Sequence, residues 1–228
     1  MKTLTIKQVA QARMRESIRV SEDLLKGGQL RTLEAVARIL VESFQRGKKV
    51  IFFGNGGSAA DAQHFAAEFV GKFHLQRPAL AALALTVDTS ALTAIGNDLS
   101  FDVVFSRQLE ALAVSGDVAI GISTSGNSSN VIRALQTARS MGLVTVGLGG
   151  ADGGLMKDVV RYCICVPSSS VPRIQECHTL LGHILVEIVE SALFGRGQSS
   201  GLLDAKEPSR PLRPSTVSSH AGHRGGRR

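Results

Sequence analysis

Four side chains that can bind a metal ion or move a proton stand at helical spacing in two distant segments. The first segment, "SAADAQHFAAEFV", carries His64 and Glu68 four residues apart, which places both on one face of a helix. The second, "RIQECHTLLGHILVEIVE", carries Gln175 and His183 eight residues apart, so these roughly share a face as well. The set suits a four-ligand site for zinc or a similar ion. It suits equally an acid–base set that moves a proton between adjacent carbons.

A histidine on an apolar helix face is more often a core residue than a functional one, so neither segment is decisive alone. His178 and Glu176 belong to the second segment too, and we expect them to point elsewhere. The presence of two such helices, each with a histidine and an oxygen donor, favours a functional site.

Two polar loops follow apolar, strand-like runs. The first, "GNGGS", is a tight turn that lets backbone N–H groups and the next helix N-terminus approach a ligand. Its residues are Asn55, Gly56, Gly57 and Ser58. The second loop, within "STSGNSSN", precedes another helix and carries the hydroxyls of Ser123, Thr124, Ser125 and Ser128. Hydroxyls beside the free amides of a helix N-terminus suit a phosphate without a nucleotide attached.

The first loop loosely fits the glycine pattern of dinucleotide-binding folds. The acidic residue expected about 20 residues later is missing, because "KFHLQRP" takes its place. No Gly-Lys-Ser/Thr follows, which excludes a nucleotide P-loop. Ser58 with Asp61 three residues later also resembles a helix-capping arrangement, which is compatible with ligand binding.

Apolar runs and helical periodicity alternate along the chain. Two helices come first, over about residues 5–25 and 30–45. Strands are expected in "KKVIFFG", "ALAALALTV", "GDVAIGIS", "LVTVGLGG" and "YCICVP", and a long last helix ends near Gly195. This order predicts an α/β fold in which a parallel five-stranded sheet is flanked by helices in three layers. Ligands bind at the carboxyl ends of such strands, so the two loops should face one crevice.

Charge and composition narrow the class of protein. The formal net charge is +7, of which residues 199–228 contribute +4, so no basic nucleic-acid-binding face is predicted. The tail over 197–228 lacks periodicity and is expected to be a disordered basic segment. We find no apolar run of membrane-spanning length and no secretory signal, so a cytoplasmic protein without a membrane partner is expected. Three cysteines, an odd number, argue against a disulfide framework.

Four separated motifs, in order, resemble the phosphoheptose isomerases of the sugar isomerase (SIS) fold. They are "GNGGSAADAQHFAAEFVGKF", "TAIGNDLSFDVVFSRQLEAL", "GDVAIGISTSGNSSNVIRAL" and "RIQECHTLLGHILVEIVE". The resemblance covers about residues 5–196. It implies one SIS domain over 46–196, preceded by helices over 1–45 that pack on the domain and within a homotetramer. In such a tetramer the active sites are built at subunit interfaces.

The resemblance also implies an activity, the conversion of sedoheptulose 7-phosphate to D-glycero-D-manno-heptose 7-phosphate in heptose biosynthesis. It makes Glu68 the base that moves the C1/C2 proton through an enediol, and His183 the acid–base partner at the substrate oxygens. A metal or histidine near the carbonyl would stabilise the enediolate charge. The zinc ligands of some members match His64, Glu68, Gln175 and His183. Substrate contacts are implied for Asn55, Gly56, Gly57, Ser58, Asp98, Ser123, Thr124, Ser125, Ser128 and Gln175.

Two positions depart from the family pattern. Lys72 stands where some relatives have arginine, so the charge is kept but a bidentate contact is lost. Pro172 stands where some relatives have aspartate, so no role for an aspartate is carried over. Two alternatives stay open: an isomerase of another seven- or eight-carbon ketose phosphate in secondary metabolism, and a non-catalytic SIS binding protein. The joint presence of both histidines, Glu68 and Gln175 favours an enzyme.

Overall fold

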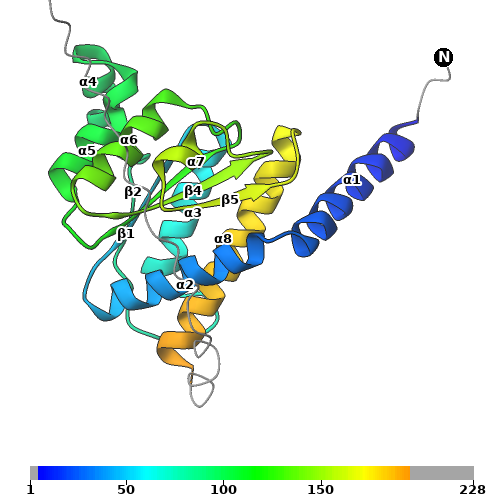
Figure 1. The fold of residues 1–228 in the computed structure, drawn as a ribbon, viewed down its shortest axis with the longest axis horizontal. Coiled ribbons are helices and arrows are strands. Elements are labelled where there is room, and N and C mark those ends of the chain that lie inside the picture. The colour runs from blue at the N-terminus through cyan, green and yellow to red at the C-terminus, as the bar shows by residue number, and fades with distance from the viewer. Residues whose placement is uncertain (1–4, 196–228) are drawn as a thin grey trace, which may run out of the picture.

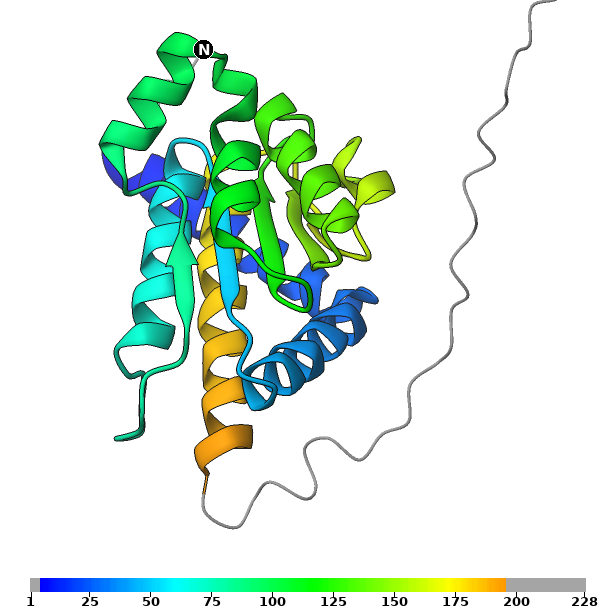
Figure 2. The ribbon, with the colours of Figure 1, turned by 90° about the vertical axis from the view of Figure 1, so that its left-hand side faces the viewer.

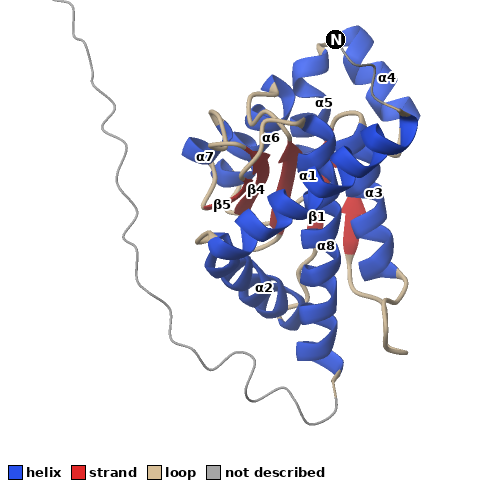
Figure 3. Cartoon of the chain, turned by 90° about the vertical axis from the view of Figure 1, so that its right-hand side faces the viewer, coloured by secondary structure: helices blue, strands red, loops and turns tan. Residues whose placement is uncertain are grey.

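Five parallel strands lie side by side in the order β2-β1-β3-β4-β5. A computed structural model describes residues 5–195, with helices on both sides of these strands (Figure 1, Figure 3). The strands are β1 (Val50–Gly54), β2 (Ala82–Ala84), β3 (Val118–Ser123), β4 (Val144–Gly150) and β5 (Tyr162–Val166). The helices are α1 (Ile6–Lys26), α2 (Gln29–Gln45), α3 (Gly57–Val70), α4 (Thr89–Asp98), the short 3-10 helix η1 (Phe101–Val103), α5 (Val104–Leu112), α6 (Ser129–Ser140), α7 (Met156–Val159) and α8 (Val171–Phe194).

Successive side chains of each strand feed two cores, one on each face of the sheet. In β1, Val50 and Phe52 join the core covered by α2, α3 and α8. The intervening Ile51 and Phe53 join the core covered by α5 and α6. Both β1 and β3 are buried along their whole length, which is why they read as unbroken apolar runs rather than as alternating ones. The predicted three-layer α/β fold is confirmed.

The two N-terminal helices differ in how they meet this body. Helix α2 packs its buried side chains against α8 and the sheet. Helix α1 extends away from the body (Figure 1) and buries only Val20 and Leu24. It begins with a capping box in which Thr5 and Gln8 bond reciprocally, so its start is fixed locally rather than by packing.

The structure differs from the sequence predictions at a few places. The second strand covers only Ala82–Ala84, since it is an edge strand with β1 as its one partner. Helix α7 was not predicted. The capping interpretation of Ser58 is wrong, because the N-cap of α3 is Gly56 at φ +55°, a backbone conformation that suits glycine, and no side chain caps the helix. The tail predicted over 197–228 lies outside the described residues.

Helix α8 is, among the described residues, the one helix long and apolar enough to cross a membrane by length and composition. No segment of membrane-spanning length was expected from the sequence. Leu181, Leu185 and Val189 of this helix pack into the core beside α2 and α3. Burial against the sheet therefore accounts for its apolar character.

One buried carboxylate holds the segment that joins α3 to β2. Glu190, near the end of α8, is only 2% exposed and accepts the backbone N–H groups of residues 73–75 at 2.7–2.9 Å. It also accepts Arg77 Nε at 2.7 Å. Burial works to raise the pKa of Glu190, but the three backbone donors and Arg77 outweigh it and lower the pKa to about 2.

The depressed pKa of Glu190 predicts an acid-sensitive contribution to stability. A carboxyl whose pKa is lower in the folded state stabilises the fold above its unfolded pKa and loses that contribution as pH falls. A shift from 4.5 to about 2 corresponds to about 3 kcal/mol. We expect Glu190→Gln to lower the free energy of unfolding by this amount at pH 7. The difference from the parent should shrink as pH falls from 4.5 towards 2.

Urea unfolding at a series of pH values and one fixed protein concentration measures this difference. Glu176→Gln is the matched control, because Glu176 lies on the same helix but its side chain is 44% exposed and its salt bridge is to Arg173 of the same helix. A Glu190→Gln difference that stays constant over this pH range would contradict the assigned contribution.

Candidate active site

The two polar loops meet at the ends of β1 and β3, where the order of the strands in the sheet reverses. Strand β2 lies on one side of β1, and β3, β4 and β5 lie on the other. In sheets of this kind, ligands bind at the carboxyl ends of the two strands where the order reverses, which here are β1 and β3. Asn55, after β1, and Asn130, in the first turn of α6, exchange two side-chain hydrogen bonds at 2.9 and 3.0 Å. The two loops therefore lie side by side, as predicted, and a ligand-binding crevice between them stays a prediction. Asn130 was not singled out from the sequence.

The hydroxyl-rich loop is organised around Ser123 at the buried end of β3. Its hydroxyl lies 3.0 Å from that of Ser128 and 3.5 Å from that of Ser125. Ser128 is the N-cap residue of α6, and its side chain makes no capping bond. Thr124 is half-buried and Ser125 is exposed. The hydroxyls of Ser123, Ser125 and Ser128 therefore lie together beside a helix N-terminus, where the dipole and free amides favour an anion.

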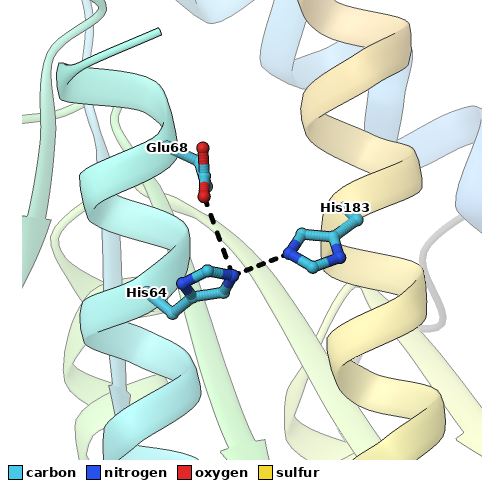
Figure 4. A group of neighbouring side chains, drawn as sticks. All are labelled: His64, Glu68 and His183. Carbon is cyan, nitrogen blue, oxygen red and sulfur yellow. Dashed lines mark hydrogen bonds and ion pairs between the residues drawn. The ribbon is translucent and has the colours of Figure 1, made fainter. Parts of the chain in front are cut away.

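Helices α3 and α8 run side by side (Figure 2) and bring three polar side chains together (Figure 4). His64 Nε2 lies 2.6 Å from His183 Nε2 and 3.7 Å from Glu68 Oε1. The ligand atoms of all three residues are within 4.8 Å of one another. His64 is exposed, whereas Glu68 and His183 are half-buried, so the cluster is open to solvent on one side.

The meeting of the two histidines depends on a close contact between their sequence neighbours. Gly182 precedes His183, and Phe65 follows His64. A Cβ built at Gly182 would overlap the Phe65 ring, so only glycine lets the helices approach this closely. The imidazole rings of His64 and His183 consequently lie edge to face, with centroids 4.9 Å apart. Glycine inside an apolar helix weakens it, and that signal in "LLGHIL" could have marked the contact in advance.

The three side chains fit a zinc ion. Two histidine nitrogens and one carboxylate oxygen form the ligand set of open, catalytic zinc sites. Imidazole nitrogens 2.6 Å apart share a proton, because two facing lone pairs would repel. A zinc ion bound to both at about 2.0–2.1 Å would take the place of this proton and move the two nitrogens apart.

Gln175, the fourth predicted ligand, lies elsewhere on α8. Its side-chain amide packs against Gly57, so closely that a Cβ at Gly57 would overlap it. Gln175 is eight residues before His183, which corresponds to about 12 Å along the helix axis. The structure thus joins three of the four predicted ligands and sets Gln175 beside the first polar loop. Its role as a ligand stays a prediction.

Between Gln175 and His183, one side chain of α8 binds α3 and another binds strand β4. The hydroxyl of Thr179 donates to Asp61 Oδ1 at 2.8 Å. His178 is fully buried, and its Nε2 donates to the Gly149 carbonyl at 3.0 Å. Burial lowers the pKa of His178, which keeps this histidine neutral. The expectation that His178 points away from His183 is therefore consistent with its position, and Asp61 and Thr179 are additions to the predicted set.

Asp98 was predicted to belong to the site, whereas Phe73 was not, and the structure places them differently. Asp98 is exposed at the end of α4, where it accepts a hydrogen bond from Asn97. Within residues 5–195 no hydrogen bond or ion pair joins Asp98 to the histidine cluster, and its substrate contact stays a prediction. Phe73 stacks on His183, with ring centroids 5.6 Å apart and planes inclined by 30°. No sequence pattern indicated Phe73, because this residue lies in the irregular segment after α3.

Comparisons with known proteins agree with this architecture. A family model described as SIS domain matches residues 15–150. Phosphoheptose isomerase 2 of Campylobacter jejuni is 51% identical over 185 residues, which cover 81% of this chain and 92% of that protein. The phosphoheptose isomerase of Aneurinibacillus thermoaerophilus is 53% identical over 182 residues, which cover 79% and 92%.

Solved structures show the same relationship. The phosphoheptose isomerase from Neisseria gonorrhoeae superposes with a TM-score of 0.77 at 44% identity, covering 82% of this chain and 100% of that one. The phosphoheptose isomerase from Francisella tularensis superposes with a TM-score of 0.79 at 30% identity, with the same coverage of both chains. With such identity over most of both chains, this protein belongs to the SIS domain proteins and, among them, to the phosphoheptose isomerase family.

Proposed function

We propose that this protein interconverts sedoheptulose 7-phosphate and D-glycero-D-manno-heptose 7-phosphate, an aldose–ketose isomerisation that serves heptose biosynthesis. The observation that carries the proposal is the meeting of His64, Glu68 and His183 between α3 and α8, in a member of the phosphoheptose isomerase family. A protein that only binds phosphosugars has no need of an acid–base cluster at this position. The cluster therefore favours catalysis over a binding-only role.

In the proposed reaction Glu68 removes the proton from C1 of the open-chain ketose. An enediol forms, and Glu68 returns the proton to C2, which leaves the aldehyde at C1. His183 faces Glu68 across the gap between the helices and moves protons at the two substrate oxygens. Both side chains are half-buried, which limits competing solvation of the reacting groups.

The zinc expected in this family would be held by His64, Glu68 and His183, with Gln175 as a further candidate ligand. When bound, zinc would supply positive charge that stabilises the enediolate oxygen. His64 lies between the other two residues, with its Nε2 atom 2.6 Å from His183 Nε2 and 3.7 Å from Glu68 Oε1.

The spacing of loops and cluster suits a long, phosphorylated chain. We assign the phosphate to Ser123, Thr124, Ser125 and Ser128, and the sugar chain to Asn55, Gly56, Gly57, Ser58, Asp98 and Gln175. Gly57 begins α3 beside these loops, and His64 follows seven residues later, about 10 Å along the helix. A substrate whose reactive carbons lie at the opposite end from its phosphate, as in an extended seven-carbon sugar, fits that separation.

A homotetramer is the second part of the proposal. Helix α1 carries exposed apolar side chains along its length, including Ile6 at 91% and Met14 at 67% exposure. Its direction away from the body (Figure 1) leaves these side chains available to other copies of the chain. We also propose a cytoplasmic location for the assembly.

Incubation with sedoheptulose 7-phosphate in D₂O, followed by NMR, tests the reaction. We expect a new aldose signal with deuterium at C2, and a loss of turnover after chelation if the metal is functional. Glu68→Gln should lower turnover and exchange at least about 100-fold, because a positioned base contributes that much or more. Light scattering should show the same oligomer. Turnover near the parent rate would exclude Glu68 as the base.

The outcome for the parent protein also separates the alternatives. Exchange with another ketose phosphate, but not with this one, would keep the chemistry and change the substrate. Binding without exchange for any ketose phosphate, by a folded oligomer loaded with zinc, would favour the non-catalytic role.

Ser125→Ala tests the phosphate loop. Loss of one hydrogen bond to a charged group costs about 1.5–3 kcal/mol, which corresponds to a KM raised about tenfold or more. The value of kcat should change little, because phosphate binding is equal in the ground and transition states. Ser140→Ala, at the far end of α6, is the control, since its hydroxyl bonds only to the Thr137 carbonyl. An unchanged KM in Ser125→Ala would argue against the assignment.

A further inference from the structure

We infer that the buried pair Arg77–Glu190 is a positioning unit for the reaction. It ties the end of α3, which carries Glu68, to α8, which carries His183, and it holds Phe73 against His183. The inference rests on the proposed function, because the groups it positions are those assigned to proton transfer.

The Glu190 side of this unit controls the surroundings of His183. Glu190 follows His183 by seven residues, two helical turns, so both lie on the same side of α8. Its two oxygens accept three consecutive backbone N–H groups, at residues 73–75. These bonds fix the backbone that carries Phe73, whose ring stacks on the His183 imidazole.

The Arg77 side controls the end of α3. Arg77 Nη2 donates to the Glu68 carbonyl at 2.9 Å, and Nη1 donates to the Phe69 carbonyl at 2.9 Å. Carbonyls in the last turn of a helix have no partner within the helix, so this guanidinium caps α3 at the residue that carries the proposed base. Arg77 Nε completes the link by donating to Glu190.

Burial makes this link stiff. The Arg77 side chain is fully buried and that of Glu190 is 2% exposed, so neither is free to reorient in water. A guanidinium can bond several acceptors in a fixed plane, whereas a lysine ammonium at the same place is a single point charge. The pair therefore fixes orientation and not only distance between α3, α8 and the connecting segment.

Positioning predicts effects on catalysis that differ from effects on substrate binding. A displacement of about 1 Å in a reacting group can lower a rate by about 100-fold. We expect Arg77→Lys and Glu190→Gln each to lower kcat by about 10- to 100-fold, with KM within about twofold of the parent. Zinc affinity, measured by competition with a chelating dye on metal-free protein, should fall about tenfold or more, as for lost supports of metal ligands.

A matched control is available at the amino end of β3. Asp117 is fully buried, pairs with Lys49 Nζ at 2.6 Å and accepts two backbone N–H groups, as Glu190 does with its partners. It precedes β3, at the end of the sheet opposite to the loops. Asp117→Asn should lower the free energy of unfolding while kcat and zinc affinity stay near the parent values.

The Phe73 contact has its own test. Phe73→Leu leaves the backbone bonds to Glu190 in place but removes the ring, and we expect kcat to fall several-fold and the His183 imidazole NMR signals to shift. Phe73→Tyr keeps the ring and should restore kcat. Equal changes of kcat in Phe73→Leu and Phe73→Tyr would show that the ring of Phe73 does not position His183.

The outcomes separate this inference from the proposed function. Parent-like kcat and zinc affinity in folded Arg77→Lys and Glu190→Gln would make the pair purely structural and overturn the inference. If the parent does not isomerise the heptose phosphate but both variants weaken zinc binding, the proposed function fails and the positioning role stands. Arg77→Lys keeps the charge, so it provides the measurement should Glu190→Gln not fold.

Discussion

Helices α3 and α8 touch at Gly182 and Phe65, and the chemistry of the protein depends on that contact. Each of these residues is next in sequence to one of the two clustered histidines. Because Gly182 has no side chain, the helices approach until the imidazole nitrogens of His64 and His183 are 2.6 Å apart. A close-packed interior transmits small changes in volume, so a larger residue here would separate the histidines as well as strain the core.

The sheet explains why the two helices are available to meet. Both follow strands, start at the carboxyl edge of the sheet and cover the same face, so they descend side by side from the level of the loops (Figure 2). The crevice between β1 and β3 brings the N-termini of α3 and α6 together, and Asn55 and Asn130 join them. The fold thus separates the loops, to which we assign the phosphate, from the histidine cluster further down α3 and α8.

Local spacing was enough to predict some of this site and not the rest. His64 and Glu68 were recognised because four residues place them on one helix face, and the loops because parallel strands end at one edge. The spacing of Gln175 and His183 predicted that both lie on one face of their helix, and in the structure both face α3. It did not indicate that they contact α3 at different levels along the helix axis. Contacts such as Asn55–Asn130 and Glu190 with residues 73–75 join segments 75 and 115–117 residues apart, which leave no periodic signal.

The use of a buried ion pair rather than apolar packing at the base of the site has a physical reason. The segment after α3 is irregular, so its backbone N–H groups need partners once they are buried. An apolar side chain at position 190 would leave these donors unpaired, whereas a carboxylate accepts three of them and the guanidinium of Arg77. Apolar contacts have no preferred direction, but these bonds do. The same four donors that keep the pKa of Glu190 near 2 therefore also define where Phe73 and the end of α3 stand relative to His183.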